Sequence, residues 1–257
     1  MRRRVTAAVF VLGLVGLVAC GDDGDDGTAG EGPGGTVLVF AAASLTDAFA
    51  DVAAAFEAAH PGTEVQLNLA GSAALREQIL EGAPAAVFAS ANQSNMDAVV
   101  DAGEVAGEAR EFARNRLQIA VPAGNAAGVT GLDDFANGDL LIGLCAEGVP
   151  CGDFARGALD NAAVEAAVDT NEPDVRALLT KIGADELDAG IVYVTDVLAA
   201  GDLVDGIDIP DEFNVVAAYP IAELVGSPNA EGGAAFVEFV LSDEGQAILT
   251  SFGFTEP

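Results

Sequence analysis

Four short segments place small residues directly before what reads as the first turn of a helix, and two of them add a serine hydroxyl. They are AASLT at residues 42–46, AGSA at 70–73, GVPCG at 148–152 and EPDV at 172–175. The first N–H groups of a helix have no partner within it and carry partial positive charge. Several such helix ends aimed at one point can hold an anion without Lys or Arg. Taken singly, each segment is also an ordinary helix cap.

The pattern of apolar residues alternates between strands and helices along the chain. Strands are expected at residues 36–41, 64–70, 86–89, 116–121, 140–144, 189–194 and 215–219. Helices are expected at residues 45–59 with Thr46 as cap, 72–81, 92–102, 152–167, 173–182 with Pro173 in the first turn, 232–241 and 244–252. Such alternation predicts an α/β fold with a mostly parallel sheet covered on both faces. Ligands of these sheets bind at the carboxyl ends of strands, where the four segments fall.

The N-terminal residues predict a location outside the cytoplasm. Residues 1–19 join a tribasic start to a short apolar run, as in a signal peptide, and Leu-Val-Ala before Cys20 resembles a bacterial lipobox. Residues 20–35 then follow as a lipidated Cys20 and a Gly/Asp-rich flexible tether. We therefore expect a lipid anchor on the extracytoplasmic face of the bacterial cell membrane.

Charge and cysteine content narrow the classes of partner. The net charge of −31 repels nucleic acid and anionic lipid. The acidity is read either as a solubilising surface or as adaptation to a saline habitat. Outside the cytoplasm disulfides persist, so Cys145 and Cys151 are expected to pair. His60 is the chain's single histidine and is distant in sequence, which argues against a metal site or a cysteine nucleophile.

Several of these runs together resemble the periplasmic molybdate-binding protein family of ABC importers. The runs are FAAASLTDA at residues 40–48, AGSAAL at 70–75, VPCG at 149–152, DVR at 174–176, GIVY at 190–193 and SFGFT at 251–255. The resemblance implies a two-lobed, type II-like periplasmic binding protein, each lobe a mostly parallel sheet flanked by helices, with a hinge. Residues 36–119 and 220–257 would form lobe one, and residues 120–219 lobe two.

The same resemblance implies a set of neutral donors to the anion. These are the hydroxyl and backbone of Ser44 and Ser72, the backbone N–H groups of Cys151 and Val175, and the Tyr193 hydroxyl. Molybdate and tungstate are fully deprotonated near neutral pH, whereas phosphate keeps a proton that a donor-only site leaves unpaired. The family implies no cofactor and no direct protein–metal bond.

The expected function is capture of molybdate or tungstate by a monomer that serves an ABC importer permease. Glu172 and Asp174 are taken as first-turn carboxylates, not ligands. One alternative is the same fold binding sulfate or an organic acid, for which Arg76, Arg110 and Arg176 are candidate partners of a carboxylate. A hydrolase is a remote alternative, because no Gly-x-Ser-x-Gly motif surrounds a serine. An adhesion or scaffold protein is a third class.

Overall fold

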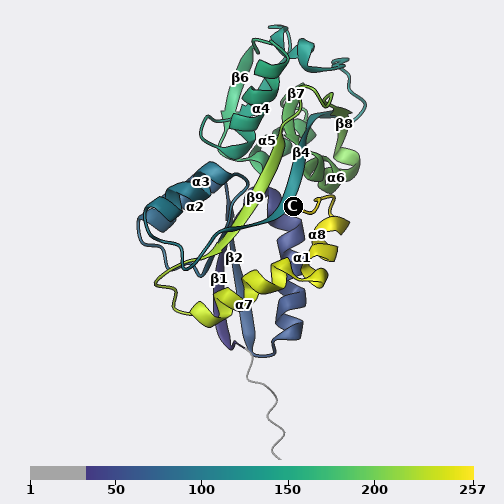
Figure 1. Ribbon diagram of the computed structural model, residues 1–257. Coiled ribbons are helices and arrows are strands. Elements are labelled where there is room, and N and C mark those ends of the chain that lie inside the picture. Colours follow the sequence, from purple (N-terminus) through teal and green to yellow (C-terminus); the bar gives the residue numbers. More distant parts are fainter. Residues whose placement is uncertain (1–32) are drawn as a thin grey trace, which may run out of the picture. The chain divides into compact units, whose positions relative to one another are not determined.

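The computed structural model describes residues 33–257, which form one compact unit from Gly32 onward (Figure 1). The predicted signal peptide, Cys20 with its lipid, and most of the predicted tether lie outside the described residues. In the part that is described, no helix has the length and apolar character needed to cross a membrane.

Strands and helices alternate as predicted. The strands are β1 Gly35–Ala42, β2 Thr63–Ala70, β3 Val87–Ala89, β4 Arg110–Pro122, β5 Ile142–Cys145, β6 Val168–Glu172, β7 Ala189–Tyr193, β8 Val204–Asp208 and β9 Val216–Glu223. The α-helices are α1 Thr46–Ala59, α2 Ser72–Leu80, α3 Gln93–Asp101, α4 Pro150–Asn161, α5 Val175–Gly183, α6 Val194–Ala200, α7 Ala230–Leu241 and α8 Asp243–Ser251. Short 3-10 helices are η1 Ala43–Leu45, η2 Leu132–Ala136 and η3 Gly201–Leu203.

The sheet consists of two halves joined by two long strands. Its order is β2-β1-β3-β9-β4-β7-β5-β6, with β8 paired to β4. In the first half β1, β2 and β3 are parallel, and in the second half β5, β6 and β7 are parallel. Strands β4 and β9 are antiparallel to each other, and in Figure 1 they run from one half into the other. Each half thus has the parallel order expected of the predicted α/β fold, and the carboxyl ends of both sets face the junction.

Several predicted element ends are wrong. The helix expected over residues 152–167 ends as α4 at Asn161, because Ala163 turns the chain with a left-handed φ of 55°. Strand β6 lies between the end of α4 and the beginning of α5. Pro173 lies outside α5, whose cap is Asp174. Thr46 is not a cap either, since its hydroxyl donates to the carbonyl of Ala43 at 2.6 Å. Strands β6 and β8 were not predicted, and β4 is longer than predicted.

Apolar residues on opposite faces of the strands form two packed clusters. In β1, Val39 and Ala41 belong to the main core, while Phe40 between them belongs to a smaller cluster with Leu75 of α2 and Met96 of α3. On the other face, phenylalanine rings from α1, β4 and α7 meet edge to face or tilted. Because Trp is absent from the sequence, Phe and the two Tyr supply the large core side chains. This packing holds the ends of β1 and β2 in place.

The predicted disulfide is present and closes the loop before α4. Cys145 ends β5 and Cys151 lies in the first turn of α4, six residues further along. The loop is tight, because a Cβ at Gly152 would lie 2.1 Å from the carbonyl oxygen of Ala146. The disulfide therefore ties the beginning of α4 to the carboxyl end of β5.

Reduction of this disulfide is expected to lower the free energy of unfolding by about 2 kcal/mol, the loop entropy of so short a ring. Urea unfolding with and without reductant measures the difference. The Cys145→Ala/Cys151→Ala variant is the control. Its free energy of unfolding should equal the lower value with and without reductant. Equal midpoints for the reduced and oxidised wild-type protein would contradict the expectation.

Candidate anion-binding site

One small cavity lies between the two halves of the sheet, where the strands of both halves end. It is lined by Ala42, Ala43, Ser44, Gly71, Ser72, Ala91, Val149, Pro150, Cys151, Asp174, Val175 and Tyr193. The space that the centre of a water-sized sphere can occupy in it is about 10 Å³. Pockets for drug-sized organic ligands span roughly 300–1,000 Å³, so this cavity suits a small ion better.

All five residues predicted to contact the anion line this cavity. Ser44 and Ser72 come from the first half, and Cys151, Val175 and Tyr193 come from the second half. The four segments with small residues therefore converge, as their position after parallel strands predicted. Direct contact of these residues with a ligand remains a prediction. Across the described residues, no group of three or more His, Cys, Asp or Glu side chains is placed to hold a metal ion.

Three of the four helix ends at the cavity begin without a side-chain cap. Within the described residues, Ala42, Gly71 and Val149 stand at the cap positions of η1, α2 and α4, and no side chain accepts from the first turn there. Pro150 is the first residue of α4 and has no N–H, so the first donor of that helix is Cys151. In α4 the N–H of Gly152 donates to the carbonyl of Val149 at 2.9 Å, which leaves the N–H of Cys151, with the uncapped first-turn N–H groups of η1 and α2, to serve an anion in the cavity.

The fourth helix end, that of α5, is capped differently. Asp174 accepts a hydrogen bond from the N–H of Ala177 at 2.9 Å, which leaves the N–H of Val175 at the cavity wall. Glu172 is not a first-turn carboxylate, as had been predicted, but the buried last residue of β6. Burial raises its pKa, but the hydrogen bond from Lys181 at 2.6 Å helps to outweigh that effect and the pKa is lowered.

The hydroxyl oxygens of both cavity serines are engaged by groups behind them. Ser72 Oγ accepts a hydrogen bond from the N–H of Ala91 at 3.0 Å. Ser44 Oγ lies 2.9 Å from the hydroxyl of Tyr219 in β9. Tyr219 is not among the residues predicted from the sequence to belong to the site. No local sequence signal marks it as part of the site, because it sits 175 residues from Ser44.

Tyr193 presents a buried hydroxyl at the cavity. Its side chain is 1% exposed, and within the described residues its hydroxyl has no hydrogen-bond partner. Burial, and next the neighbouring Tyr219, raise the pKa of Tyr193 well above its ordinary value, so the phenol keeps its proton. A buried donor without a partner is costly, which marks this hydroxyl as one that awaits an acceptor.

Two contacts join the halves directly beside the cavity. The guanidinium of Arg176 in α5 pairs with the carboxylate of Asp47 in α1. Gly71 before α2 packs so closely on the second half that a Cβ there would lie 2.6 Å from the carbonyl oxygen of Pro173. The two sides are therefore in contact around the cavity.

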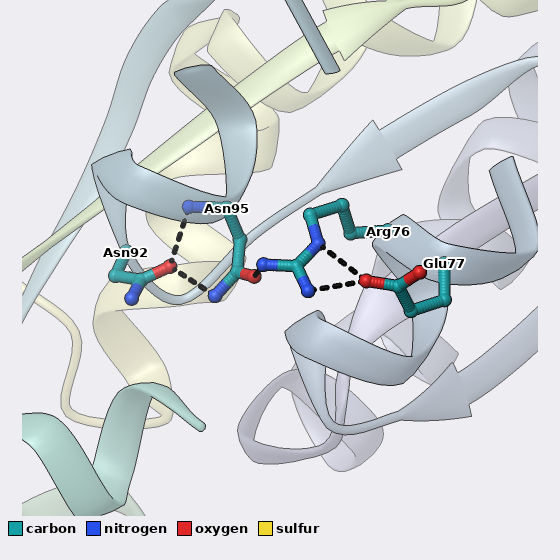
Figure 2. Close-up of polar contacts among 4 residues, drawn as sticks. All are labelled: Arg76, Glu77, Asn92 and Asn95. Carbon is teal, nitrogen blue, oxygen red and sulfur yellow. Dashed lines mark hydrogen bonds and ion pairs between the residues drawn. The ribbon is translucent and has the colours of Figure 1, made fainter. Parts of the chain in front are cut away.

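The arginines proposed for an organic acid are engaged elsewhere. Figure 2 shows the guanidinium of Arg76 between Glu77 and Asn95, with Arg76 Nη1 at 2.9 Å from Asn95 Oδ1. Asn95 in turn binds Asn92, the N-terminal cap of α3, so this network fixes the beginning of α3. Arg110 pairs with an exposed glutamate of α7. None of the described residues that line the cavity is an arginine or a lysine.

Asp196 is a buried carboxylate beside the site that the sequence reasoning missed. Its Oδ2 accepts a hydrogen bond from the backbone N–H of Tyr193 at 3.0 Å, so it holds the end of β7. Burial raises the pKa of Asp196 to about 7, against the opposing effects of that N–H and of Arg176. Asp47 and Asp174 raise it further. The sequence signal that could have identified Asp196 is an acidic residue three positions after the residue that precedes a helix, the spacing of a capping box.

The chain is similar in sequence to known solute-binding proteins. The family model described as "Bacterial extracellular solute-binding protein" matches residues 37–255. The chain is 35% identical over 254 residues to the molybdate-binding protein ModA of Mycobacterium tuberculosis H37Rv, covering 98% of this chain and 97% of that one.

Two solved structures resemble the chain in fold. The periplasmic molybdate-binding protein of Azotobacter vinelandii matches with a TM-score of 0.75 and 17% identity, over 86% of this chain and 99% of that one. The sulfate-binding protein SubI of Mycobacterium tuberculosis H37Rv matches with a TM-score of 0.74 and 18% identity, over 86% of both chains. At these identities the likeness shows the fold alone. It confirms the predicted periplasmic-binding-protein fold.

The raised pKa of Asp196 makes the stability of the folded state depend on pH. The ordinary pKa is 3.8 and the folded value is about 7, so the folded state holds this proton more tightly. The stability that the folded state gains from holding this proton is fully present below about pH 4 and is lost as the pH rises to about 7. Asn can still accept from Tyr193 without a charge. We expect Asp196→Asn to raise the free energy of unfolding at pH 8 by on the order of 2–4 kcal/mol, with little gain at pH 4.

Urea unfolding of both proteins across pH 4–8 measures this effect. Asp139→Asn, at an exposed position before β5, is the control for removing one negative charge from this acidic protein. A gain from Asp196→Asn that is the same at pH 4 and pH 8 would contradict the assignment.

Proposed function

Because the chain belongs to the bacterial extracellular solute-binding protein family, as its motifs predicted, we propose that it captures molybdate or tungstate for an ABC importer. A solute-binding role comes with the family. The choice of ligand rests on one observation: uncapped helix ends and hydroxyls from both halves converge on one small cavity without a cationic side chain. The name of the 35% identical M. tuberculosis relative supports the same ligand.

The donor set favours a fully deprotonated oxyanion. Helix N-termini and buried hydroxyls offer hydrogens, and hydrogen bonds to a charged acceptor are stronger than neutral ones. The one carboxylate in the lining, Asp174, already accepts from the N–H of Ala177. A protonated phosphate would bring a hydrogen with no good acceptor, which is a cost of about 1–3 kcal/mol. Sulfate carries no such proton, so cavity size must discriminate against it.

We further propose that the two sheet halves act as lobes that close on the anion. Residues 36–119 with 220–257 would form one lobe, and residues 120–219 the other. Closing brings Ser44 and Ser72 against Cys151, Val175 and Tyr193, so that the ligand bridges both sides. The ion pair of Arg176 and Asp47, together with the Gly71–Pro173 contact, would then belong to the closed form.

The remaining parts of the proposal concern location and partners. A lipid on Cys20 would hold the protein at the extracytoplasmic face of the membrane, within reach of a permease. The protein would act as a monomer and without catalysis. The single histidine, His60, supports a role without acid–base chemistry, because it packs on Phe56 at the end of α1 with ring centres 4.4 Å apart.

Thermal unfolding in the presence of oxyanions tests the ligand. At a concentration about 1,000 times Kd, a ligand that binds only the folded state stabilises it by about 4 kcal/mol. We expect molybdate and tungstate to raise the Tm by roughly 8–16 °C. Sulfate and phosphate at equal ionic strength are the controls and should leave the Tm unchanged. A Tm that responds to sulfate alone, or to none of the four anions, would sink the molybdate proposal.

Gly71→Ala tests whether the halves must meet around the ligand. Its φ of −57° suits alanine, so the added Cβ acts mainly by pressing on the carbonyl of Pro173. We expect a loss of molybdate affinity of tenfold or more, measured by calorimetric titration, with a small change in the ligand-free Tm. Gly138→Ala is the matched control, because a Cβ there meets nothing within 4 Å. Unchanged affinity in Gly71→Ala would contradict a closed binding form.

A further inference from the structure

We infer that Tyr219 is a positioning residue for the anion site: its hydroxyl donates to Ser44 Oγ and thereby turns the Ser44 hydrogen toward the cavity. The inference rests on the proposed function and deepens it. It assigns the preference for fully deprotonated anions to a group that stands behind the cavity and is absent from its lining.

Ser72 shows the same arrangement with an unambiguous donor. The N–H of Ala91 can only donate, so Ser72 Oγ must accept at that 3.0 Å contact. A serine hydroxyl has one hydrogen, and the hydrogen of Ser72 is then left for another acceptor. Ser72 is 1% exposed and lines the cavity, so that acceptor has to come from the cavity side.

The contact between Ser44 and Tyr219 could in principle run either way. If Ser44 donated, it would turn lone pairs toward the anion, and the buried Tyr219 hydrogen would need another acceptor. Among the described residues, Ser44 Oγ is the only hydrogen-bond partner of the Tyr219 hydroxyl, so a Tyr219 hydrogen turned away from Ser44 would have no acceptor within hydrogen-bond distance. If Tyr219 donates, its hydrogen is paired at 2.9 Å and the Ser44 hydrogen is available to the ligand. An anion in the cavity selects the second arrangement.

Tyr219 remains a donor across the physiological pH range. It is completely buried, and burial raises the pKa of its phenol well above the ordinary value, while the contact with Ser44 lowers it by less. The ring is held on three sides by Phe112, Tyr193 and Phe254, with ring centres 5.5–6.2 Å apart. The hydroxyl is therefore both protonated and fixed in place.

The consequence is that two of the three cavity hydroxyls, those of Ser44 and Ser72, present their hydrogens to the cavity, while the third, that of Tyr193, has no partner among the described residues. Tyr219 links two of them, by its hydrogen bond to Ser44 and by its ring contact with Tyr193. Without the Tyr219 hydroxyl, Ser44 could rotate and accept the proton of hydrogen phosphate. Tyr219 therefore contributes selectivity as well as affinity.

The test is Tyr219→Phe, which keeps the ring and removes the hydroxyl. Calorimetric titration of the purified full chain with molybdate and with phosphate is run at pH 7.5 on the wild type first. We expect the variant to bind molybdate about tenfold more weakly, the worth of one buried hydrogen bond, and to bind phosphate at concentrations at which the wild type shows no binding. A purely structural role would weaken molybdate binding and leave phosphate unbound in both proteins, which would overturn the inference.

A double-mutant cycle with Ser44→Ala supplies the second readout. If Tyr219 acts through Ser44, the variant Ser44→Ala/Tyr219→Phe binds molybdate as Ser44→Ala alone does. Losses that add fully would overturn the inference while leaving the proposed function intact. A wild-type protein that does not bind molybdate would overturn the proposed function, and this inference with it. Ligand-free thermal unfolding of each variant verifies that it is folded.

Discussion

An anion held without a cationic side chain needs many hydrogens brought to one point from several directions, and the rest of this structure depends on that constraint. One helix end contributes only the N–H groups of its first turn. Four ends and a tyrosine hydroxyl can meet only if two parallel sets of strands point their carboxyl ends at each other. Strands β4 and β9 make this possible by running antiparallel from one half of the sheet into the other. Alanine and glycine line the cavity because larger side chains would cover the N–H groups.

The same constraint explains how so acidic a protein can serve an anion. The net charge of −31 acts over a distance that salt screens within about 8–10 Å, whereas helix ends and hydroxyls act at contact distance. The acidity is therefore compatible with the cavity, although it slows the approach of an anion at low salt. Asp196 shows the local cost of acidity, because a carboxylate buried beside Tyr193 is most stable when it keeps its proton.

Specificity within this fold has to come from the size of the cavity, which separates sulfate from molybdate, and from the orientation of a few hydrogens, which disfavours protonated phosphate. A sulfate-binding protein and a molybdate-binding protein share the fold at closely similar TM-scores, so the backbone alone does not select the ligand. What can differ is the size of the cavity, together with the groups behind it that orient its hydroxyls. The Ala91 N–H behind Ser72 and the Tyr219 hydroxyl behind Ser44 are such groups.

The sequence by itself determined the alternation of strands and helices and the disulfide, because short-range patterns encode them, and its motifs determined the family, whose resemblance implied the five residues predicted to contact the anion. Small residues before a helix and a cysteine pair six residues apart are local features. The short strands β6 and β8 were not predicted, because VDTNE is mostly polar and VDGID combines two aspartates with a glycine, as loops do. Only the tertiary structure decided the Ser44–Tyr219 bond, the Arg176–Asp47 pair and the burial of Asp196. Each brings together groups from distant elements or depends on how those elements pack, and no local periodicity records which distant side chain will arrive.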